Sequence, residues 1–76
     1  MDRRNTMQIS RQYVGVTGRT ARANVNCRQD PATSSWSVVI TADYVPTVTL
    51  DNVSDAALFS RIETYLDKWI QDLPFK

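Results

Sequence analysis

The chain has 76 residues, a formal net charge of +1, one cysteine and no histidine. A chain of this length forms one small domain with a limited core. Without histidine it lacks the usual proton shuttle at neutral pH and the commonest metal ligand, so we expect no enzyme, no metal site and no cofactor.

The cysteine and the apolar runs bear on where the protein acts. Cys27 has no second cysteine with which to form an internal disulfide. No apolar run is long enough to cross a membrane, and the first residues show no secretion signal. We therefore expect a cytoplasmic or virion protein with no membrane partner.

Charge is divided unevenly along the chain. Residues 1–38 carry six arginines and two aspartates, a net charge of +4, whereas residues 39–76 carry three basic and six acidic side chains, a net charge of −3. Every basic residue of the first half is arginine, whose planar guanidinium suits phosphates and bases. The first half therefore favours an anionic partner.

The beginning of the chain predicts an arm and a hairpin. Residues 1–7 are polar and arginine-rich, so we expect a flexible arm there and a single domain over residues 8–76. A strand pattern covers residues 8–16. Thr17 and Gly18 suit a two-residue hairpin loop after it, because glycine supplies the positive φ of a tight turn.

The second strand has the most informative pattern, because apolar residues alternate in it with arginine and asparagine. Alternate side chains of a strand lie on opposite faces of a sheet. The core face would carry Ala21, Ala23, Val25 and Cys27. The outer face would carry Arg22, Asn24, Asn26 and Arg28. A two-residue hairpin loop adds Arg11 and Tyr13 of the first strand to this outer face.

Two further strands and a helix follow. Residues 35–43 alternate with Thr41 on the outer face, and residues 47–50 form a short fourth strand. Ser54 can cap a helix that ends before Pro74. The predicted fold is therefore α+β: a four-stranded antiparallel β-meander with one C-terminal amphipathic helix packed on one face (ββββα).

The predicted helix carries eight large apolar side chains on an arc of about 140°. Most would cover the sheet, but the stripe is larger than a sheet with several alanines needs. We therefore expect a homodimer or a larger assembly, formed through the helices or by pairing of strand edges. The helix residues assigned to self-association are Phe59, Ile62, Tyr65, Leu66, Trp69 and Ile70. Glu63 and Asp67 lie on the exposed arc as solvated charges.

The outer face of the sheet suits a nucleic acid. Its predicted contact residues are Arg11, Tyr13, Arg22, Asn24, Asn26, Arg28 and Thr41. Guanidinium groups contact phosphates, amides bind base edges and a tyrosine ring stacks on a base. RNA or another single-stranded nucleic acid is one expected partner. Two alternatives stay open: a small cytoplasmic modulator or inhibitor, whether or not phage-encoded, that docks this basic face on an acidic protein, and a face that is merely solvated.

The order of these features resembles the C-terminal half of the coat proteins of small single-stranded RNA bacteriophages. The matching stretch comprises residues 20–28 (TARANVNCR), residues 36–42 (WSVVITA) and the helix from Ser54. The resemblance implies a non-catalytic coat or packaging protein. In that family the sheet presents its polar side chains to packaged RNA, and the helix crosses to the partner of an interlocked dimer.

Overall fold

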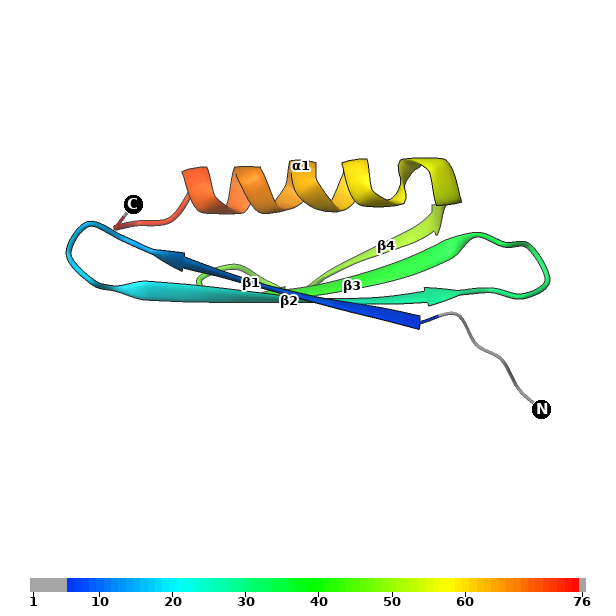
Figure 1. Cartoon of the computed structure of the whole chain (residues 1–76), viewed down its shortest axis with the longest axis horizontal. Coiled ribbons are helices and arrows are strands. Elements are labelled where there is room, and N and C mark those ends of the chain that lie inside the picture. Colours follow the sequence, from blue (N-terminus) through cyan, green and yellow to red (C-terminus); the bar gives the residue numbers. More distant parts are fainter. Residues whose placement is uncertain (1–5, 76) are drawn as a thin grey trace.

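The computed structural model describes residues 6–75. Its elements are β1 (Thr6–Val14), β2 (Thr20–Gln29), β3 (Trp36–Ala42), β4 (Val48–Val53), a short 3-10 helix (Asp55–Ala57) and α1 (Leu58–Gln71). The strands form one antiparallel sheet in the order β1-β2-β3-β4, and α1 lies across one face of it (Figure 1). The predicted ββββα fold is confirmed.

The domain begins slightly earlier than predicted. β1 starts at Thr6, so Thr6 and Met7 belong to the sheet and not to the arm to which we assigned them. Residues 1–5, the rest of the expected arm, lie outside the described residues. At the start of the helical segment the predicted cap is present, since the Ser54 hydroxyl accepts a hydrogen bond from the N–H of Ala57 at 3.2 Å.

The hairpin between β1 and β2 has one more loop residue than we predicted. The N–H of Gly15 donates to the carbonyl of Arg19 at 2.7 Å, and the N–H of Gly18 donates to the carbonyl of Gly15 at 3.0 Å. Gly18 has a φ of 89°. These features define a three-residue loop in which glycine occupies the left-handed region. The extra residue shifts the pairing of the strands by one position.

A shift of one position turns every side chain of a strand to the other face of the sheet. Arg11 and Tyr13 are therefore opposite Ala23 and Ala21, on the side covered by the helix. The prediction that Arg11 and Tyr13 belong to the outer face is wrong. The two-residue loop would have placed Val14 on the core side, whereas in the structure it is 60% exposed.

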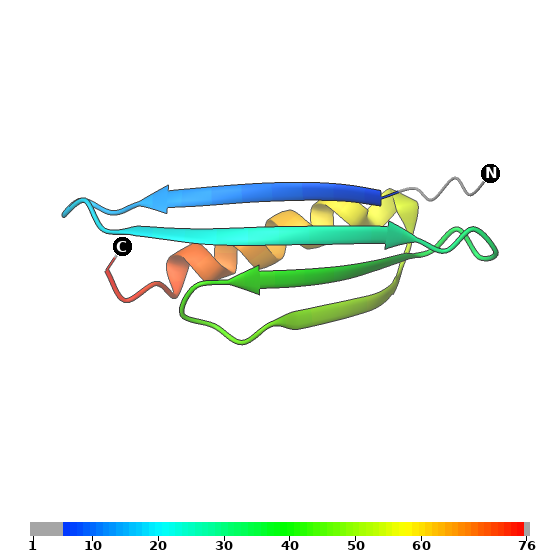
Figure 2. The ribbon, with the colours of Figure 1, turned by 90° about the horizontal axis from the view of Figure 1, so that it is seen from below.

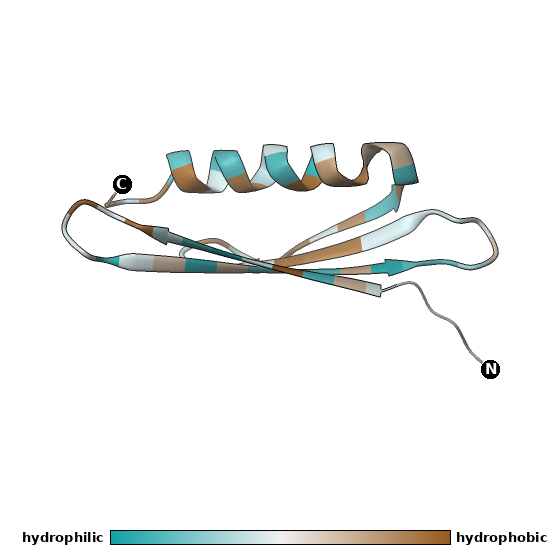
Figure 3. Cartoon of the chain, viewed as in Figure 1, coloured by the Kyte–Doolittle hydropathy of each residue, from teal (hydrophilic) through white to brown (hydrophobic). Residues whose placement is uncertain are grey.

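The core lies between the sheet and α1. Its buried side chains are Ala21, Ala23, Val25, Cys27, Trp36, Val38, Ile40, Val53, Leu58, Ile62, Leu66, Trp69 and Leu73. Hydrophobic residues of α1 lie on its side toward the sheet, and hydrophilic residues lie on the opposite side (Figure 3). The apolar face predicted for β2 is thus confirmed.

The helix stripe is used mainly within one chain. Ile62, Leu66 and Trp69, which we assigned to self-association, are at most 2% exposed and belong to the core. Phe59 is 58% exposed, and Tyr65 and Ile70 are half-buried. The sheet therefore accommodates more of the stripe than we expected, because its alanines leave space for large side chains of the helix.

Asp43 connects β2, the end of β3 and α1. Its carbonyl accepts a hydrogen bond from Nε1 of Trp69 at 2.9 Å. Its carboxylate accepts from the backbone N–H of Arg22 at 2.9 Å, while its own N–H donates to the carbonyl of Arg22 at 3.0 Å. The carboxylate thus takes the place that the carbonyl would occupy in a regular ladder. β3 ends at this point because the carbonyl is used by the helix.

Candidate nucleic-acid interface

The face of the sheet away from α1 is mostly polar, with Val14 and Val39 as its apolar members. Figure 2 views the molecule from this side, with the sheet in front of the helix. The exposed polar side chains on it are Thr6, Gln8, Ser10, Gln12, Thr20, Arg22, Asn24, Asn26, Arg28, Ser37, Thr41 and Thr49. Five of the seven predicted contact residues, Arg22, Asn24, Asn26, Arg28 and Thr41, therefore lie together on this face.

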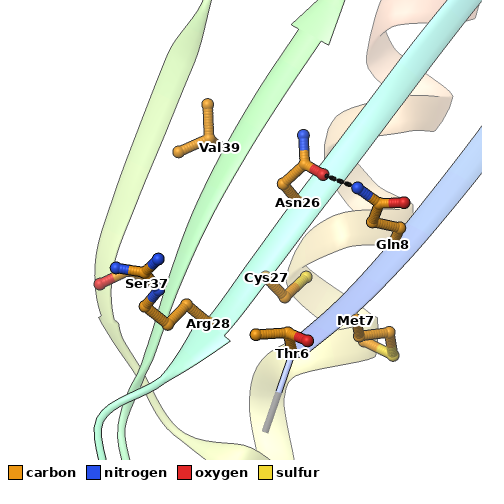
Figure 4. Close-up of a pocket in the computed structure, with 8 residues that line it drawn as sticks. All are labelled: Thr6, Met7, Gln8, Asn26, Cys27, Arg28, Ser37 and Val39. Carbon is orange, nitrogen blue, oxygen red and sulfur yellow. Dashed lines mark hydrogen bonds between the residues drawn. The ribbon is translucent and has the colours of Figure 1, made fainter. Parts of the chain in front are cut away.

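The asparagines of β2 are held by side chains of β1. Nε2 of Gln8 donates to Oδ1 of Asn26 at 2.9 Å, as Figure 4 shows. The hydroxyl of Ser10 donates to Oδ1 of Asn24 at 3.0 Å. Because these bonds use the amide oxygens, the amide N–H groups of both asparagines are left as donors to a ligand. The amides form an ordered row along the β1–β2 seam.

Three hollows follow this row. The first has a volume of about 480 Å³ and is lined at one end of the face by Arg28, Asn26 and Gln8 (Figure 4). The second shares Gln8 and Asn26 with the first and continues to Asn24. The third continues from Asn24 to Arg22. The hollows share lining residues and together form one shallow trough along β2, bordered by β1 throughout and by β3 in the first two hollows.

The trough has a positive charge at each end. Arg22 and Arg28 are six positions apart on β2, which corresponds to about 20 Å along a strand. Both side chains are exposed, and neither forms an ion pair with a carboxylate among residues 6–75. Neutral amides and hydroxyls occupy the space between them. This arrangement can bind an extended molecule with spaced negative charges and many hydrogen-bonding groups.

The corrected register changes what the face can do. Tyr13 lies on the helix side, with its ring centroid 6.5 Å from that of Phe75, so it cannot stack on a ligand of the outer face. None of the outer-face side chains within residues 6–75 is aromatic. Recognition on this face therefore depends on hydrogen bonds and phosphate contacts, because stacking needs an aromatic ring.

Sequence reasoning missed Gln8, Ser10 and Gln12 as members of the face. A signal for them was present, because residues 6–13 alternate between polar side chains and larger, mostly apolar ones. That alternation places Met7 and Ile9 on the core side and the polar residues outside. The two-residue interpretation of the loop contradicted this pattern.

The chemistry of Cys27 and of the acidic side chains follows from where they lie in the fold. Cys27 is 3% exposed, and burial raises the pKa of its thiol, so it is not a nucleophile in the folded domain. Across the described part of the chain, no group of three or more His, Cys, Asp or Glu side chains is arranged to hold a metal ion. No helix within residues 6–75 is long and apolar enough to span a membrane.

Comparisons of the chain with family models, with curated proteins and with solved structures gave no match. The class of protein is therefore defined by the fold and the face alone. It is a small α+β domain in which one helix covers one side of a four-stranded sheet, and a shallow trough lined by arginine, amide and hydroxyl groups and by Val39 runs along the other side.

Proposed function

We propose that the chain is a non-catalytic, self-associating protein that binds RNA on the outer face of its sheet, as in a small phage coat or packaging protein. The connected trough between Arg28 and Arg22 carries this proposal. Single-stranded RNA presents phosphates at intervals, 2′-hydroxyls and unpaired base edges. The arginines would contact phosphates, and Asn24 and Asn26 would donate to base edges or 2′-hydroxyls.

The mixture of groups in the trough favours RNA over an acidic protein. A surface that recognises clustered carboxylates needs closely spaced cations. Here two arginines are separated by about 20 Å, and the side chains between them are neutral donors and acceptors. RNA offers both charge and hydrogen-bonding groups at every nucleotide, so it uses the whole length of the trough.

The proposal is tested by removing the two charges at the ends of the trough. In the double variant Arg22→Ala/Arg28→Ala, we expect the affinity for a short fluorescent single-stranded RNA to fall at least about tenfold. The slope of log affinity against log salt should decrease by about 1.4, since each phosphate contact contributes about 0.7 for single strands. Fluorescence anisotropy over a range of salt concentrations measures both quantities.

The matched control is Arg61→Ala/Lys68→Ala, which removes the same charge from exposed positions on α1. The control should retain the affinity and salt slope of the wild type. Equal losses in both double variants would show general charge attraction and not a site on the sheet. Unchanged binding in Arg22→Ala/Arg28→Ala would exclude this face. Competition by polyglutamate as effective as that by unlabelled RNA would favour the acidic-protein alternative.

A further inference from the structure

The two edges of the sheet differ in how they are protected. β4 has six residues, follows Pro46 and contains an irregularity in its pairing near Asn52, which has a φ of 57°. Short strands, bulges and proline all discourage pairing with another chain. β1 has nine residues in regular register with β2 and contains no proline, and its only charged side chain is Arg11. β1 is therefore the edge open to a further strand.

The hairpin establishes which backbone groups of β1 are free. Gly15 bonds to β2 through its N–H, and bonded positions alternate along an antiparallel pair. The backbone groups of Ile9 and Arg11 therefore point toward β2. Those of Gln8, Ser10 and Gln12 point away from the sheet, as a row of unpaired donors and acceptors at the edge.

The helix side of β1 is only partly covered. Met7, Ile9, Arg11 and Tyr13 are all half-buried, whereas the corresponding side chains of β2 are buried. Arg11 lies opposite Ala23, between Ile9 and Tyr13 on the same face of β1, and forms no ion pair with any carboxylate within residues 6–75. A half-buried arginine without a carboxylate partner gains from a partner outside its own chain.

One flank of α1 faces this partly covered strip. A hollow lined by Leu50, Arg61 and Lys68 identifies the basic flank as the one toward β4. The opposite flank, which carries Phe59 and Glu63, therefore faces β1. Phe59 is 58% exposed, and Glu63 is exposed. An apolar strip with one arginine on the strand thus lies next to a glutamate on the helix.

We propose that the β1 strands of two copies pair antiparallel about a two-fold axis at Ser10, which joins the two sheets into one of eight strands. This inference deepens the self-association in the proposed function and rests on it. The register uses all of β1 and places every free donor opposite a free acceptor. It brings Gln8 opposite Gln12 of the partner subunit, and Ile9 opposite Arg11 of the partner subunit.

These pairs are self-complementary, as a two-fold interface requires. The glutamines can form an amide pair on the outer face. On the helix side the methylenes of Arg11 would cover the partner's Ile9. The thioether of Met7 would lie against the ring of the partner's Tyr13. Each contact occurs twice, once on either side of the axis.

Charge also fits this register. α1 and β1 run in the same direction (Figure 1). Trp69 bonds to the carbonyl of Asp43, which lies beside Arg22 of β2 and hence near Gln12 of β1. Ile9 lies about 10 Å before Gln12 along the strand, and Glu63 lies about 9 Å before Trp69 along the helix. Ile9 and Glu63 are therefore at similar levels along their elements. Arg11 from one copy, placed opposite Ile9 of the other, would approach the carboxylate of Glu63 on that copy.

The dimer would extend the proposed interface for RNA. The trough follows the β1–β2 seam, so the two troughs would lie side by side, separated only by the new β1–β1 seam. Four arginines, two from each copy, would then surround one continuous polar surface.

A proline at the centre of the edge tests the pairing. In Ser10→Pro the lost N–H points away from β2, so the domain should remain folded, while the bonds across the two-fold axis are lost. We expect the dimer dissociation constant to rise about tenfold or more, because two hydrogen bonds are removed. The control is Thr49→Pro. The N–H that it removes from β4 also points away from the sheet, and the dimer should be unchanged.

Charge reversal tests the register without changing the backbone. Arg11→Glu and Glu63→Arg should each weaken the dimer, and the double variant should restore it. Sedimentation velocity on nuclease-treated protein measures the dissociation constants, and circular dichroism confirms folding. Failure of the double variant to restore the dimer would overturn the Arg11–Glu63 contact and this register.

The outcomes for the dimer and for RNA are separable. A wild-type chain that stays monomeric up to about 1 mM would overturn the inference and identify Arg11 as a guard against edge pairing. The RNA proposal would survive if that monomer still bound RNA through Arg22 and Arg28. If Ser10→Pro disrupts the dimer but the wild-type dimer has no affinity for RNA, the β1–β1 pairing would be supported and RNA binding would be excluded. A dimer unaffected by Ser10→Pro and disrupted by Thr49→Pro would assign the interface to β4.

Discussion

At the scale of single residues, the two tryptophans show how polar tips secure apolar side chains. Nε1 of Trp36 donates to Oδ1 of Asp55 at 2.9 Å, which ties the start of β3 to the beginning of the helical segment. Nε1 of Trp69 donates to the carbonyl of Asp43, which ties the last part of α1 to the end of β3. A buried indole N–H without such a partner would destabilise the core.

Trp69 should be the most costly single truncation in the helix. Trp69→Ala removes a large side chain that is 2% exposed, and we expect the free energy of unfolding to fall by about 3–5 kcal/mol. This is a large part of the stability of a small domain. Trp69→Phe keeps one aromatic ring and loses the bond to Asp43 and part of the packed volume, so its cost should be smaller, about 1–2 kcal/mol. Urea denaturation followed by circular dichroism measures both values, and similar losses would contradict the packing described.

At the scale of elements, the loop between β1 and β2 decides the composition of both faces of β1. The three residues Val16, Thr17 and Gly18 set the register, and the register sends Arg11 to the helix side and Gln12 to the outer side. Phe75 packs against the same hairpin, where the guanidinium carbon of Arg19 lies 4.7 Å from the centre of its ring. Local turn geometry therefore controls which side chains can reach a ligand.

A two-residue turn at the same place should displace β1. Thr17→Asn creates an Asn-Gly pair at positions 17–18, which favours a two-residue turn with Val16 opposite Arg19 and so shifts the register by one. Met7 and Ile9 would then turn to solvent, and we expect a loss of at least about 2 kcal/mol from exposed apolar surface. The control Val16→Asn keeps the loop length at a position that is 94% exposed. Denaturation gives the energies, and nuclear Overhauser contacts between Tyr13 and Ala21 report the register. Wild-type stability and register in Thr17→Asn would show that the turn does not decide the pairing.

At the scale of the whole molecule, one side of the sheet stabilises the domain and the other is free for binding. The apolar side chains of β2 and β3 pack under α1, while the polar side chains of the same strands remain exposed. Substitutions on the outer face should therefore change binding more than stability. This separation allows the proposed interface to be tested in folded variants.

Cys27 should make the stability of the domain depend on pH above neutrality. Because burial raises the pKa of its thiol, the unfolded chain loses the proton at lower pH than the folded chain. The contribution of the buried thiol to the free energy of unfolding is fully present below the pKa that Cys27 has in the unfolded chain. It is lost as the pH rises toward the pKa that Cys27 has in the folded domain. We expect the stability difference between wild type and Cys27→Ala to decrease above about pH 9. Denaturation of both proteins at several pH values measures it, and a constant difference would contradict the burial of the thiol.

The sequence by itself determined the elements and most of their faces. Alternation along β2 and β3 assigned the core residues Val25 and Ile40 and the outer residues Asn24 and Thr41, because side-chain direction in a strand follows directly from residue parity. Helical spacing likewise identified the apolar stripe of α1. Arg22 and Arg28, the charges of the candidate interface, were predictable for the same reason.

Tertiary structure decided the register of β1 and which side chains of the apolar stripe of α1 are buried. Two- and three-residue turns were both compatible with the sequence at Gly18, so the choice depended on packing Met7 and Ile9 against the core. The apolar arc of α1 is wider than the strip that one sheet can cover, so spacing alone could not tell that Leu66 is buried and Phe59 exposed. Both outcomes depend on contacts between elements, which a local pattern does not contain.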